Sequence, residues 1–403
     1  MLAVLITFAM ASLSATIVFP IFAPLFLSET SSIFIRSFSL YTRTLLLGVF
    51  LASFPLAQFF FSPVIGDFSD HRGRKKAFLL TLAIETIGYF VSAWGVQTVH
   101  LSLLFLGRLL TGLAAGNVSV CLATLVDLSR SEKEKVRYFS FGSIIMGIAF
   151  VLGPFIGGKL SDASVSPLFS LAFPMWIGFV LTLFNFCIVW LLFHETMPNV
   201  SRYTFKIAKA IENVELAFRT NHIRDLYLIY FYYLFSWNMI YQFLPAVMVS
   251  KFASLPSMIG DASALMGLVW IVGSAAMLWL MHTSLPMKRF LILFLIIFSF
   301  LGFFVSVPET YHTFLWVTSG AVLFAGSMWP IFTSAISNAA DQSVQGKIMG
   351  LSQSIQSLAM VLAPLIGGFL IELHTAIPFI LSSTSALLAG LFLTRTKSLY
   401  FQM

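Results

Sequence analysis

Long apolar stretches recur along the chain and are separated by short polar segments. A helix needs about 20 apolar residues to cross the hydrocarbon core of a bilayer. Stretches near this length lie on both sides of a polar gap, at 1–27, 43–65, 77–97, 101–126, 138–160 and 171–193, and then at 226–250, 262–282, 290–307, 313–338, 345–371 and 376–394. The pattern predicts an all-α membrane protein with twelve transmembrane helices, six before the gap and six after it.

Two of these stretches carry nearly the same sequence. Met146–Leu160 and Gln356–Leu370 agree at eight of fifteen positions, including the proline and the Gly-Gly pair that follows it. At the same offset, Ala115-Gly116 falls on Ala325-Gly326. A tandem repeat of this kind predicts two six-helix bundles related by a pseudo-twofold axis. It is typical of alternating-access transporters, which hold their substrate between the two halves.

The repeat and the polar gap divide the chain. We expect an N-terminal six-helix bundle at 1–194, a cytoplasmic linker at 195–225 and a C-terminal six-helix bundle at 226–397. The final residues, 398–403, look like the remnant of an engineered protease site, so we assign no function to them. Within the linker, apolar side chains recur at helical spacing, which predicts an amphipathic helix at the membrane surface; these are Ile207, Ile211, Val214 and Phe218.

Composition and charge support a membrane location. Hydrophobic residues make up 59% of the chain and charged residues 10%, against about 25% charged residues in soluble domains. Of the 23 Lys and Arg residues, 18 fall on one side of the membrane if both termini are placed there. This bias predicts a multi-pass protein of the inner (cytoplasmic) membrane with both termini in the cytoplasm. The net charge of +7 is then a topology signal and argues against a nucleic-acid partner.

The sequence contains no recognisable motif for catalysis, metal binding or nucleotide binding. No His, Cys and carboxylate group has metal-ligand spacing, and no phosphate-binding loop occurs. His194-Glu195 is followed by Thr-Met-Pro, so it does not form a His-Glu-x-x-His zinc motif. We therefore expect a protein that is not an enzyme and has no cofactor or metal. Its partners would be a small molecule and the lipid bilayer, it would work as a monomer, and a proton gradient would supply the energy.

A dense polar motif, Gly66–Lys76, connects the second and third stretches. A glycine at a helix end allows a neighbour to approach closely, and an aspartate can cap a facing helix through its dipole. The motif resembles the cytoplasmic loop signature of the major facilitator superfamily, G-x-x-x-D-R-x-G-R-K, with His71 where arginine is usual. The matching residues are Gly66, Asp70, Gly73, Arg74 and Lys75. The resemblance implies a latch that closes the cytoplasmic side against the eleventh helix, expected to begin near Gln345–Gly350.

Two further motifs strengthen this resemblance. Gly107–Gly116 is similar to the fourth-helix motif of the family, with Thr111 in place of glutamine. Asp127, followed ten residues later by Arg137, resembles the connection between helices four and five in the drug:proton antiporters. The resemblance implies that Asp127 and Arg74 of this chain form an ion pair that is part of the cytoplasmic gate.

The repeated proline-glycine segment is itself a family motif. Gly153, Pro154, Gly157 and Gly158 match the G-P-x-x-G-G core of the fifth-helix motif, with Ala149 where a leading glycine is usual. The motif is associated with exporters, including the tetracycline efflux proteins, which the first half resembles most. Small residues also permit close helix packing in lipid, so a packing and hinge role is the simpler interpretation of these four positions.

Ionisable residues inside a span are costly and by default suggest function. Arg108 lies well inside the fourth stretch and remains charged there; it could bind substrate or serve as a structural anchor bonded to backbone carbonyls. Glu85 lies within the third stretch. Removal from water would favour its protonated form, so it could carry a proton, or it could pair with a cation at a helix end. The efflux relatives often place an acid on the first or the third helix; this chain has none on the first, and Glu85 on the third does not clearly match their position.

The resemblance also implies a central cavity lined by helices one, four, seven and ten. Aromatic and amide side chains in the corresponding stretches, together with one cation, suit a small amphipathic organic compound. Each aromatic residue could instead face lipid or the core. The candidate substrate-binding residues are Arg108, Asn117, Trp237, Asn238, Tyr241, Gln242, Trp329 and Gln353.

The sequence thus predicts a secondary transporter of the drug:proton antiporter type that works by alternating access. Its expected function is proton-coupled export of a small amphipathic organic compound. The alternative is import of a metabolite such as an amino acid, an organic acid or a siderophore. This alternative stays open because the first helix lacks an acid, the fifth-helix motif is imperfect and Thr111 replaces the usual glutamine.

Overall fold

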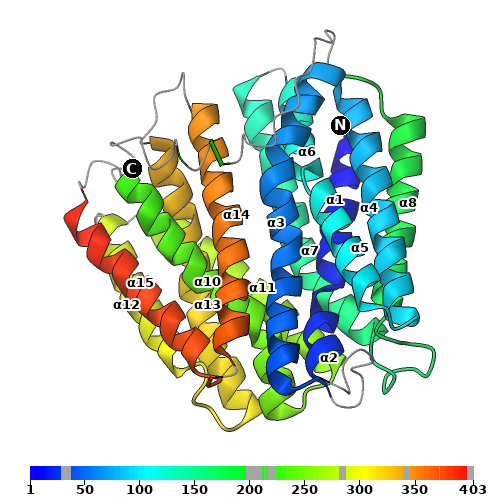
Figure 1. The fold of residues 1–403 in the computed structure, drawn as a ribbon. Helices are drawn as coiled ribbons and strands as arrows, with labels where there is room; N and C mark the ends of the chain where they lie inside the picture. The colour runs from blue at the N-terminus through cyan, green and yellow to red at the C-terminus, as the bar shows by residue number, and fades with distance from the viewer. Residues whose placement is uncertain are drawn as a thin grey trace. The chain divides into compact units, whose positions relative to one another are not determined.

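The computed structural model describes residues 1–28, 38–129, 131–196, 211–212, 215, 224–280, 287–338, 345–371 and 373–396. All the regular structure in these ranges is helical (Figure 1). The helices group into two compact units. Unit 1 comprises Met1–Ser37, Ser53–Ala210 and Ser254–Ala264, and unit 2 comprises Phe38–Ala52, Ile211–Ala253 and Leu265–Met403. Each unit therefore includes a short segment from the sequence half that makes up most of the other.

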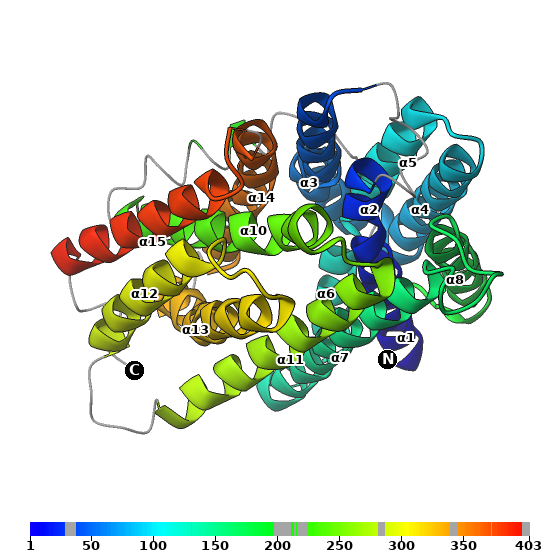
Figure 2. The same cartoon turned by 90° about the horizontal axis from the view of Figure 1, so that it is seen from below.

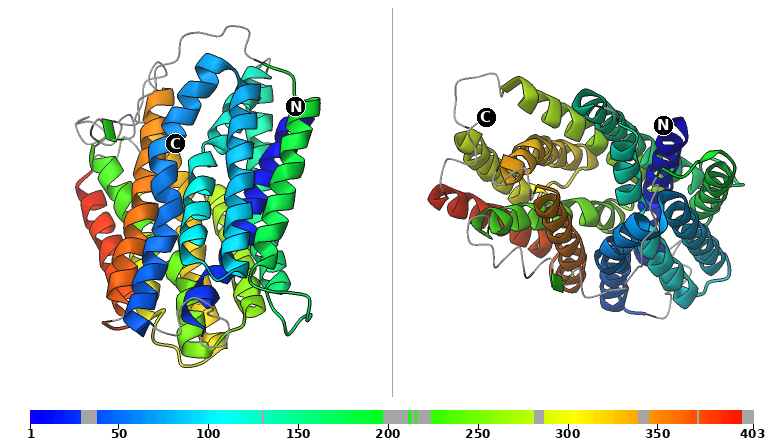
Figure 3. Two further views of the ribbon diagram at one scale, coloured as in Figure 1. Left: turned by 45° about the vertical axis from the view of Figure 1, so that its right-hand side comes forward. Right: turned by 90° about the horizontal axis from the view of Figure 1, so that it is seen from above.

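Unit 1 is built from the spans of the first half. The first span is broken near Pro20, where a short 3-10 turn, η1, separates two helices. The fourth span is broken at Ala115-Gly116. In chain order the elements are α1 (Leu2–Ile17), η1 (Phe19–Ile21), α2 (Phe22–Leu27), most of α3 (Leu40–Arg72), α4 (Arg74–Gln97), α5 (Leu101–Ala114), α6 (Asn117–Asp127), α7 (Glu132–Leu160) and α8 (Phe173–Leu192). Within the unit, α4 packs on α5 and α8, and α1 packs on α7 and α8 (Figure 3).

Unit 2 holds the helices of the second half. They are α10 (Arg224–Phe252), α11 (Pro256–Leu280), α12 (Met287–Phe304), α13 (Tyr311–Asn338), α14 (Gln345–Leu370) and α15 (Ile377–Arg395), with the start of α11 counted in unit 1. Here α10 packs on α14 and α15, and α12 packs on α13 and α15 (Figure 2). Helix α14 begins at Gln345, where the sequence predicts the eleventh helix to start.

Eleven helical segments of the described chain are long and apolar enough to cross a membrane. Helix α10 is long enough, with 29 residues, but it falls outside this group. Tyr, Trp, Asn and Gln side chains make it less apolar, and most of its residues are buried inside the protein rather than exposed to lipid. With α10 included, the described helices give the predicted twelve-span, all-α membrane fold.

Helix α3 extends further than the hydrophobic pattern predicts. The apolar stretch ends near residue 65, but the helix continues to Arg72, because helical hydrogen bonding does not need apolar side chains once the chain has left the bilayer. Gly66 and Asp70 therefore lie within a helix, not in a loop. A Cβ on Gly66 would meet no described atom within 4 Å, and the approach of the eleventh helix expected there stays a prediction. The break between α3 and α4 is Gly73, with φ 97°, a conformation that favours glycine.

Two glycine pairs bring helix backbones into close contact, one pair in each unit. In unit 1, a Cβ on Gly158 of α7 would lie 2.7 Å from the Cα atom of Gly260 of α11. In unit 2, a Cβ on Gly368 of α14 would lie 2.7 Å from the Cα atom of Gly48 of α3. Gly158 and Gly368 occupy equivalent positions in the sequence repeat. The repeat therefore places the same backbone contact in both units.

Candidate functional site

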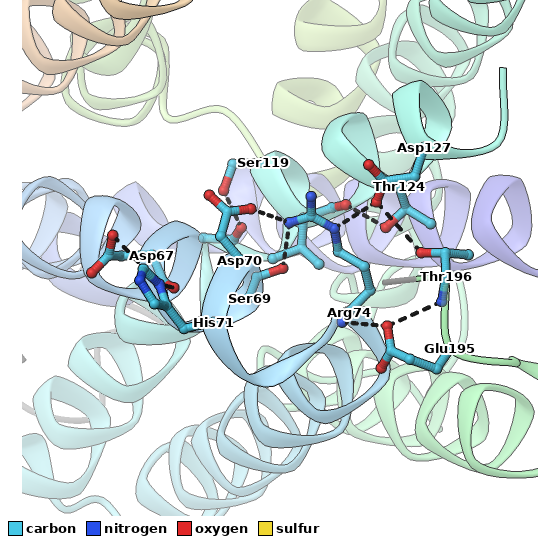
Figure 4. A network of polar contacts seen from close by, with 12 residues as sticks. Asp67, Ser69, Asp70, His71, Arg74, Ser119, Thr124, Asp127, Glu195 and Thr196 are labelled. Carbon is cyan, nitrogen blue, oxygen red and sulfur yellow. Dashed lines mark hydrogen bonds and ion pairs between the residues drawn. The ribbon is translucent and has the colours of Figure 1, made fainter. Parts of the chain in front are cut away.

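A buried arginine links three elements at the start of α4. The Arg74 Nε atom donates to Asp127 Oδ2 at 2.8 Å, and its Nη1 atom donates to Ser69 Oγ at 2.8 Å and to Asp70 Oδ1 (Figure 4). The Arg74 side chain is only 7% exposed, whereas that of Asp70 is 57% exposed. The ion pair expected between Arg74 and Asp127 is therefore present. We call Ser69, Asp70, Arg74 and Asp127 the Arg74 network.

Sequence reasoning missed two residues that contact this network. Glu195, directly after the last span of the first half, accepts hydrogen bonds from the backbone amides of Arg74, at 2.8 Å, and Lys75, at 3.0 Å. Thr196 donates its hydroxyl hydrogen to Asp127 Oδ2 at 3.4 Å (Figure 4). In the sequence, Glu195 and Thr196 look like the beginning of a polar linker. Nothing in the sequence indicates that they fold back onto α4.

A second polar cluster lies inside the membrane-spanning part of unit 1. Glu85 is buried on α4, and the Ser14 hydroxyl on α1 donates to its Oε1 atom at 3.2 Å. Tyr89, one turn after Glu85, donates its hydroxyl hydrogen to the Ser14 backbone carbonyl at 2.6 Å. The Asn117 amide lies beside the Glu85 carboxyl group, but outside hydrogen-bond geometry, and its two polar atoms have no hydrogen-bond partner among the described residues. The first helix thus reaches Glu85 through a serine rather than an acid.

Arg108 lies between two aromatic rings of the same unit. Its Cζ atom is 4.6 Å from the ring centroid of Phe22 and 4.5 Å from that of Phe54. Both distances are within the range of cation–π attraction. Tyr89 is within electrostatic reach of both Arg108 and Glu85. The structure therefore brings Arg108, Glu85 and Asn117 into one neighbourhood, and Ser14 and Tyr89, which sequence reasoning missed, connect its parts.

Unit 2 presents a row of aromatic rings instead of charges. Trp237 stacks on Tyr241, with ring centroids 5.3 Å apart, and lies 4.6 Å from Trp270. Trp270 is 6.4 Å from Trp329, which is 6.1 Å from Tyr230. The three tryptophans are partly exposed, so the row is not sealed inside the core. Sequence reasoning named Trp237, Tyr241 and Trp329 but missed Trp270, which no periodicity distinguishes from other apolar residues of α11.

The amides predicted for this site have different surroundings. Asn238 donates to the Leu234 carbonyl at 2.8 Å, a bond within its own helix. Gln242 donates to Asn238 Oδ1 at 3.3 Å and to the Met360 carbonyl of α14 at 3.4 Å. Gln353 is exposed on α14. The structure therefore groups Asn238 and Gln242 through a hydrogen bond.

The fifth-helix motif lies against α1. A Cβ on Gly153 would overlap the Thr16 side chain, and a Cβ on Gly157 would overlap the Ile17 carbonyl. Thr16 also donates its hydroxyl hydrogen to the Ala149 carbonyl of α7 at 2.9 Å. The close approach of α1 and α7 therefore depends on the missing side chains at Gly153 and Gly157.

A third polar group fastens the end of α7 to the start of α11. Asp162 accepts hydrogen bonds from the backbone and hydroxyl of Ser257, and from Ser164, which donates its backbone amide at 2.9 Å and its hydroxyl at 2.6 Å. Lys159 pairs with Asp261 at 2.7 Å. Burial by itself raises the pKa of Asp162, but the hydrogen bonds from Ser164 and Ser257 outweigh it and hold the pKa below its ordinary value. The Asp162 carboxylate therefore acts as a fixed anionic cap for α11.

The described side chains contain no group of three or more His, Cys, Asp or Glu residues that could hold a metal ion. Two repeated six-helix sets, with buried polar groups inside the spans, define a membrane transport protein of the tandem-repeat class. The sequence model of the Major Facilitator Superfamily matches residues 4–364 and, in a second match, 226–399. The chain belongs to the Major Facilitator Superfamily, and it is a transporter rather than an enzyme.

Individual relatives agree with this assignment. The tetracycline resistance protein, class H, of Pasteurella multocida is 25% identical over 346 residues, which cover 82% of this chain and 80% of that protein. Among solved structures, the human organic anion transporter MFSD10 (TETRAN) is 19% identical with a TM-score of 0.68, covering 97% of this chain and 98% of that one. A D-xylose-proton symporter is 13% identical with a TM-score of 0.75, covering 97% of this chain and 96% of that one. These two structures share the fold.

Proposed function

We propose that this transporter exports a small amphipathic organic compound in exchange for protons. The observation that carries the proposal is the Glu85 cluster, a buried carboxyl group beside the Asn117 amide, whose polar atoms meet no hydrogen-bond geometry among the described residues. Burial disfavours the charged form of a carboxyl group and contact with water favours it. A site that is alternately shielded and opened during transport therefore binds and releases a proton, and Glu85 is the residue to which we assign this exchange.

The cargo is proposed from the side chains of each unit taken separately. In unit 1, the Arg108 guanidinium between Phe22 and Phe54 suits an anionic group on a compound with an apolar body. In unit 2, the row from Tyr241 to Tyr230 offers ring faces on which a flat aromatic portion can stack. An amphipathic compound with an aromatic portion and an anionic group satisfies both. Export is favoured over import because the relatives of this chain include proteins named for tetracycline and multidrug resistance.

The same proposal assigns a place in the membrane and a gate. We take the protein to be a monomer in the inner membrane with both termini in the cytoplasm, and we take residues 195–225 to be the linker between the halves. The Arg74 network is then the cytoplasmic gate. Its ion pairs to Asp70 and Asp127 form when that side closes and break when it opens.

Transport in proteoliposomes under an imposed pH gradient tests the proposal. The assay follows a panel of lipophilic drugs, dyes and organic acids in vesicles containing the wild-type protein, Glu85→Gln or Glu309→Gln. Glu309 is exposed between α12 and α13, so its replacement is a matched charge control. We expect Glu85→Gln to abolish accumulation driven by the pH gradient but to leave exchange of labelled for unlabelled cargo intact, while Glu309→Gln behaves as wild type.

Two outcomes contradict the proposal. Cargo that moves in the same direction as protons would establish import instead of export. An unchanged pH profile for Glu85→Gln would remove this residue from the proton pathway, because its neutral amide can no longer carry a proton.

A further inference from the structure

The first turn of α4 lacks a cap from its own segment. The first backbone amides of a helix have no intrahelical partner and are commonly satisfied by a Ser, Thr, Asp or Asn side chain at the preceding position. In α4 that position is Gly73, which makes no side-chain cap hydrogen bond. The carboxylate of Glu195, which is 121 residues beyond Arg74 in the chain, takes over this role. It accepts hydrogen bonds from the amides of Arg74 and Lys75.

Gly73 and Glu195 are matched to each other. A Cβ on Gly73 would collide with the Glu195 carboxylate, so the glycine leaves room for the distant cap as well as allowing the positive φ. A carboxylate at a helix N-terminus is also favoured by the helix dipole. The segment that carries Glu195 is held in place by Phe193, which is 4% exposed and packs edge-on against Phe78 at 5.3 Å.

We propose that Glu195 is a positioning residue of the cytoplasmic gate: it fixes the Arg74 backbone, from which the guanidinium reaches Asp70 and Asp127. Arg74 is the first residue of α4, so its backbone is held by few helical bonds and depends on the cap. Thr196 reinforces the contact by donating to Asp127, the acceptor that Arg74 also uses. Glu195 and Thr196 are thereby hydrogen-bonded directly to residues of the gate (Figure 4).

The cap is tested by hydrogen exchange of the purified full-length protein in detergent, measured by mass spectrometry. Loss of a hydrogen bond to a charged acceptor costs enough to change an exchange rate about tenfold. We therefore expect Glu195→Ala to speed exchange of the Arg74 and Lys75 amides about tenfold. Glu195→Gln retains one acceptor oxygen and should give a smaller increase. Glu212→Gln, which removes an exposed charge from the same segment, should change neither amide.

The effect on the gate is tested by thiol labelling. A Thr124→Cys reporter is placed in a Cys121→Ala, Cys187→Ala background, because Thr124 is fully buried one turn before Asp127. We expect Glu195→Ala to raise the maleimide labelling rate at this reporter several-fold. Faster exchange at α4 with unchanged labelling would overturn the inference, because the cap would then be local to the helix. Unchanged exchange in both Glu195 variants would overturn it as well.

This inference rests on the part of the proposed function that makes the Arg74 network a gate, and it does not depend on the identity of the cargo. The labelling assay distinguishes a failure of the Glu195 role from a failure of the gate itself. Asp127→Asn removes a gate residue directly and should raise labelling of the same reporter. If it does and Glu195→Ala does not, only the positioning role fails. If Asp127→Asn leaves labelling unchanged, the gate of the proposed function fails, and the role of Glu195 falls with it.

Discussion

Replacing Gly158 by alanine introduces a methyl group at a close backbone contact between two helices of unit 1. The new Cβ would lie 2.7 Å from Gly260 Cα and 2.7 Å from the Pro256 carbonyl oxygen. Carbon atoms pack best at about 3.5–4.0 Å, so the overlap is about 1 Å. Both obstructing atoms belong to the backbone and cannot rotate away, so α7 and the start of α11 must separate.

The expected magnitude follows from two opposing contributions. Overpacking of a well-packed contact costs about 1–3 kcal/mol, whereas alanine in place of a helical glycine contributes about 1 kcal/mol of stability. Because the obstructing atoms are backbone and cannot yield, the overpacking cost falls in the upper part of its range, about 2–3 kcal/mol. We therefore expect Gly158→Ala to lower the free energy of unfolding by about 1–2 kcal/mol. Gly66→Ala is the matched control, because a Cβ there meets no described atom within 4 Å. It should raise the free energy of unfolding by about 0.5–1 kcal/mol.

Reversible unfolding in mixed micelles, titrated with sodium dodecyl sulfate, measures both values. Gly66 belongs to the signature motif and Gly158 to the fifth-helix motif. Membership of a family motif alone gives no reason for one substitution to stabilise the protein and the other to destabilise it. The structure does. Equal destabilisation by the two substitutions, or a Gly158→Ala protein as stable as wild type, would refute the reasoning from backbone contact.

Other predictions concern the polar groups and the aromatic row. A double-mutant cycle of unfolding free energies should give a coupling of about 2 kcal/mol between Arg74 and Asp127 but about 0.5 kcal/mol between Arg74 and the exposed Asp70; the reverse order would contradict the burial argument. Because the folded-state pKa of Asp162 lies below its ordinary value of 3.8, its stabilisation is complete above that pH and is lost as the pH falls through the folded-state value. The stability difference between wild type and Asp162→Asn, followed by thermal unfolding, should therefore be constant near neutral pH and shrink below about pH 4. Trp270→Ala should weaken binding of an aromatic cargo about fivefold, since one ring contact is worth about 1 kcal/mol; fluorescence quenching measures this, and unchanged affinity would remove the row from the binding site.

The helices and the repeat were predictable because lipid imposes a strong rule on sequence. Each span must be apolar over a fixed length, and α10, although less apolar than the others, still keeps that length. The end of α3 was misplaced because hydropathy marks the edge of the bilayer, not the end of the helix. The ion pair of Arg74 with Asp127 was expected because the family motif connects two polar segments that carry opposite charges.

Contacts between ordinary residues far apart in the sequence were not predictable. Ser14 meets Glu85 across 71 residues, and serine inside an apolar helix gives no sign of its partner. Trp270 joins the aromatic row because α11 and α13 approach closely where Ser327 donates to the Gly273 carbonyl at 2.9 Å. Glu195 reads as a linker residue until its position beside Gly73 is known. In each case the contact depends on how closely two distant segments pack, and the residue types alone do not reveal this.

The exchange of short segments between the two units bears on how the protein is made. The six spans of the first half are synthesised before Ser254–Ala264, which belong to unit 1 and supply the glycine that faces Gly158. Unit 1 is therefore unfinished until the ribosome has passed residue 264, and Phe38–Ala52 in turn await a second half that is not yet synthesised. Insertion of the first six helices and completion of their packing are thus separate events in biosynthesis. A chain truncated at the linker would be released into the membrane with Gly48 and Gly158 exposed, because their partners Gly368 and Gly260 would be missing.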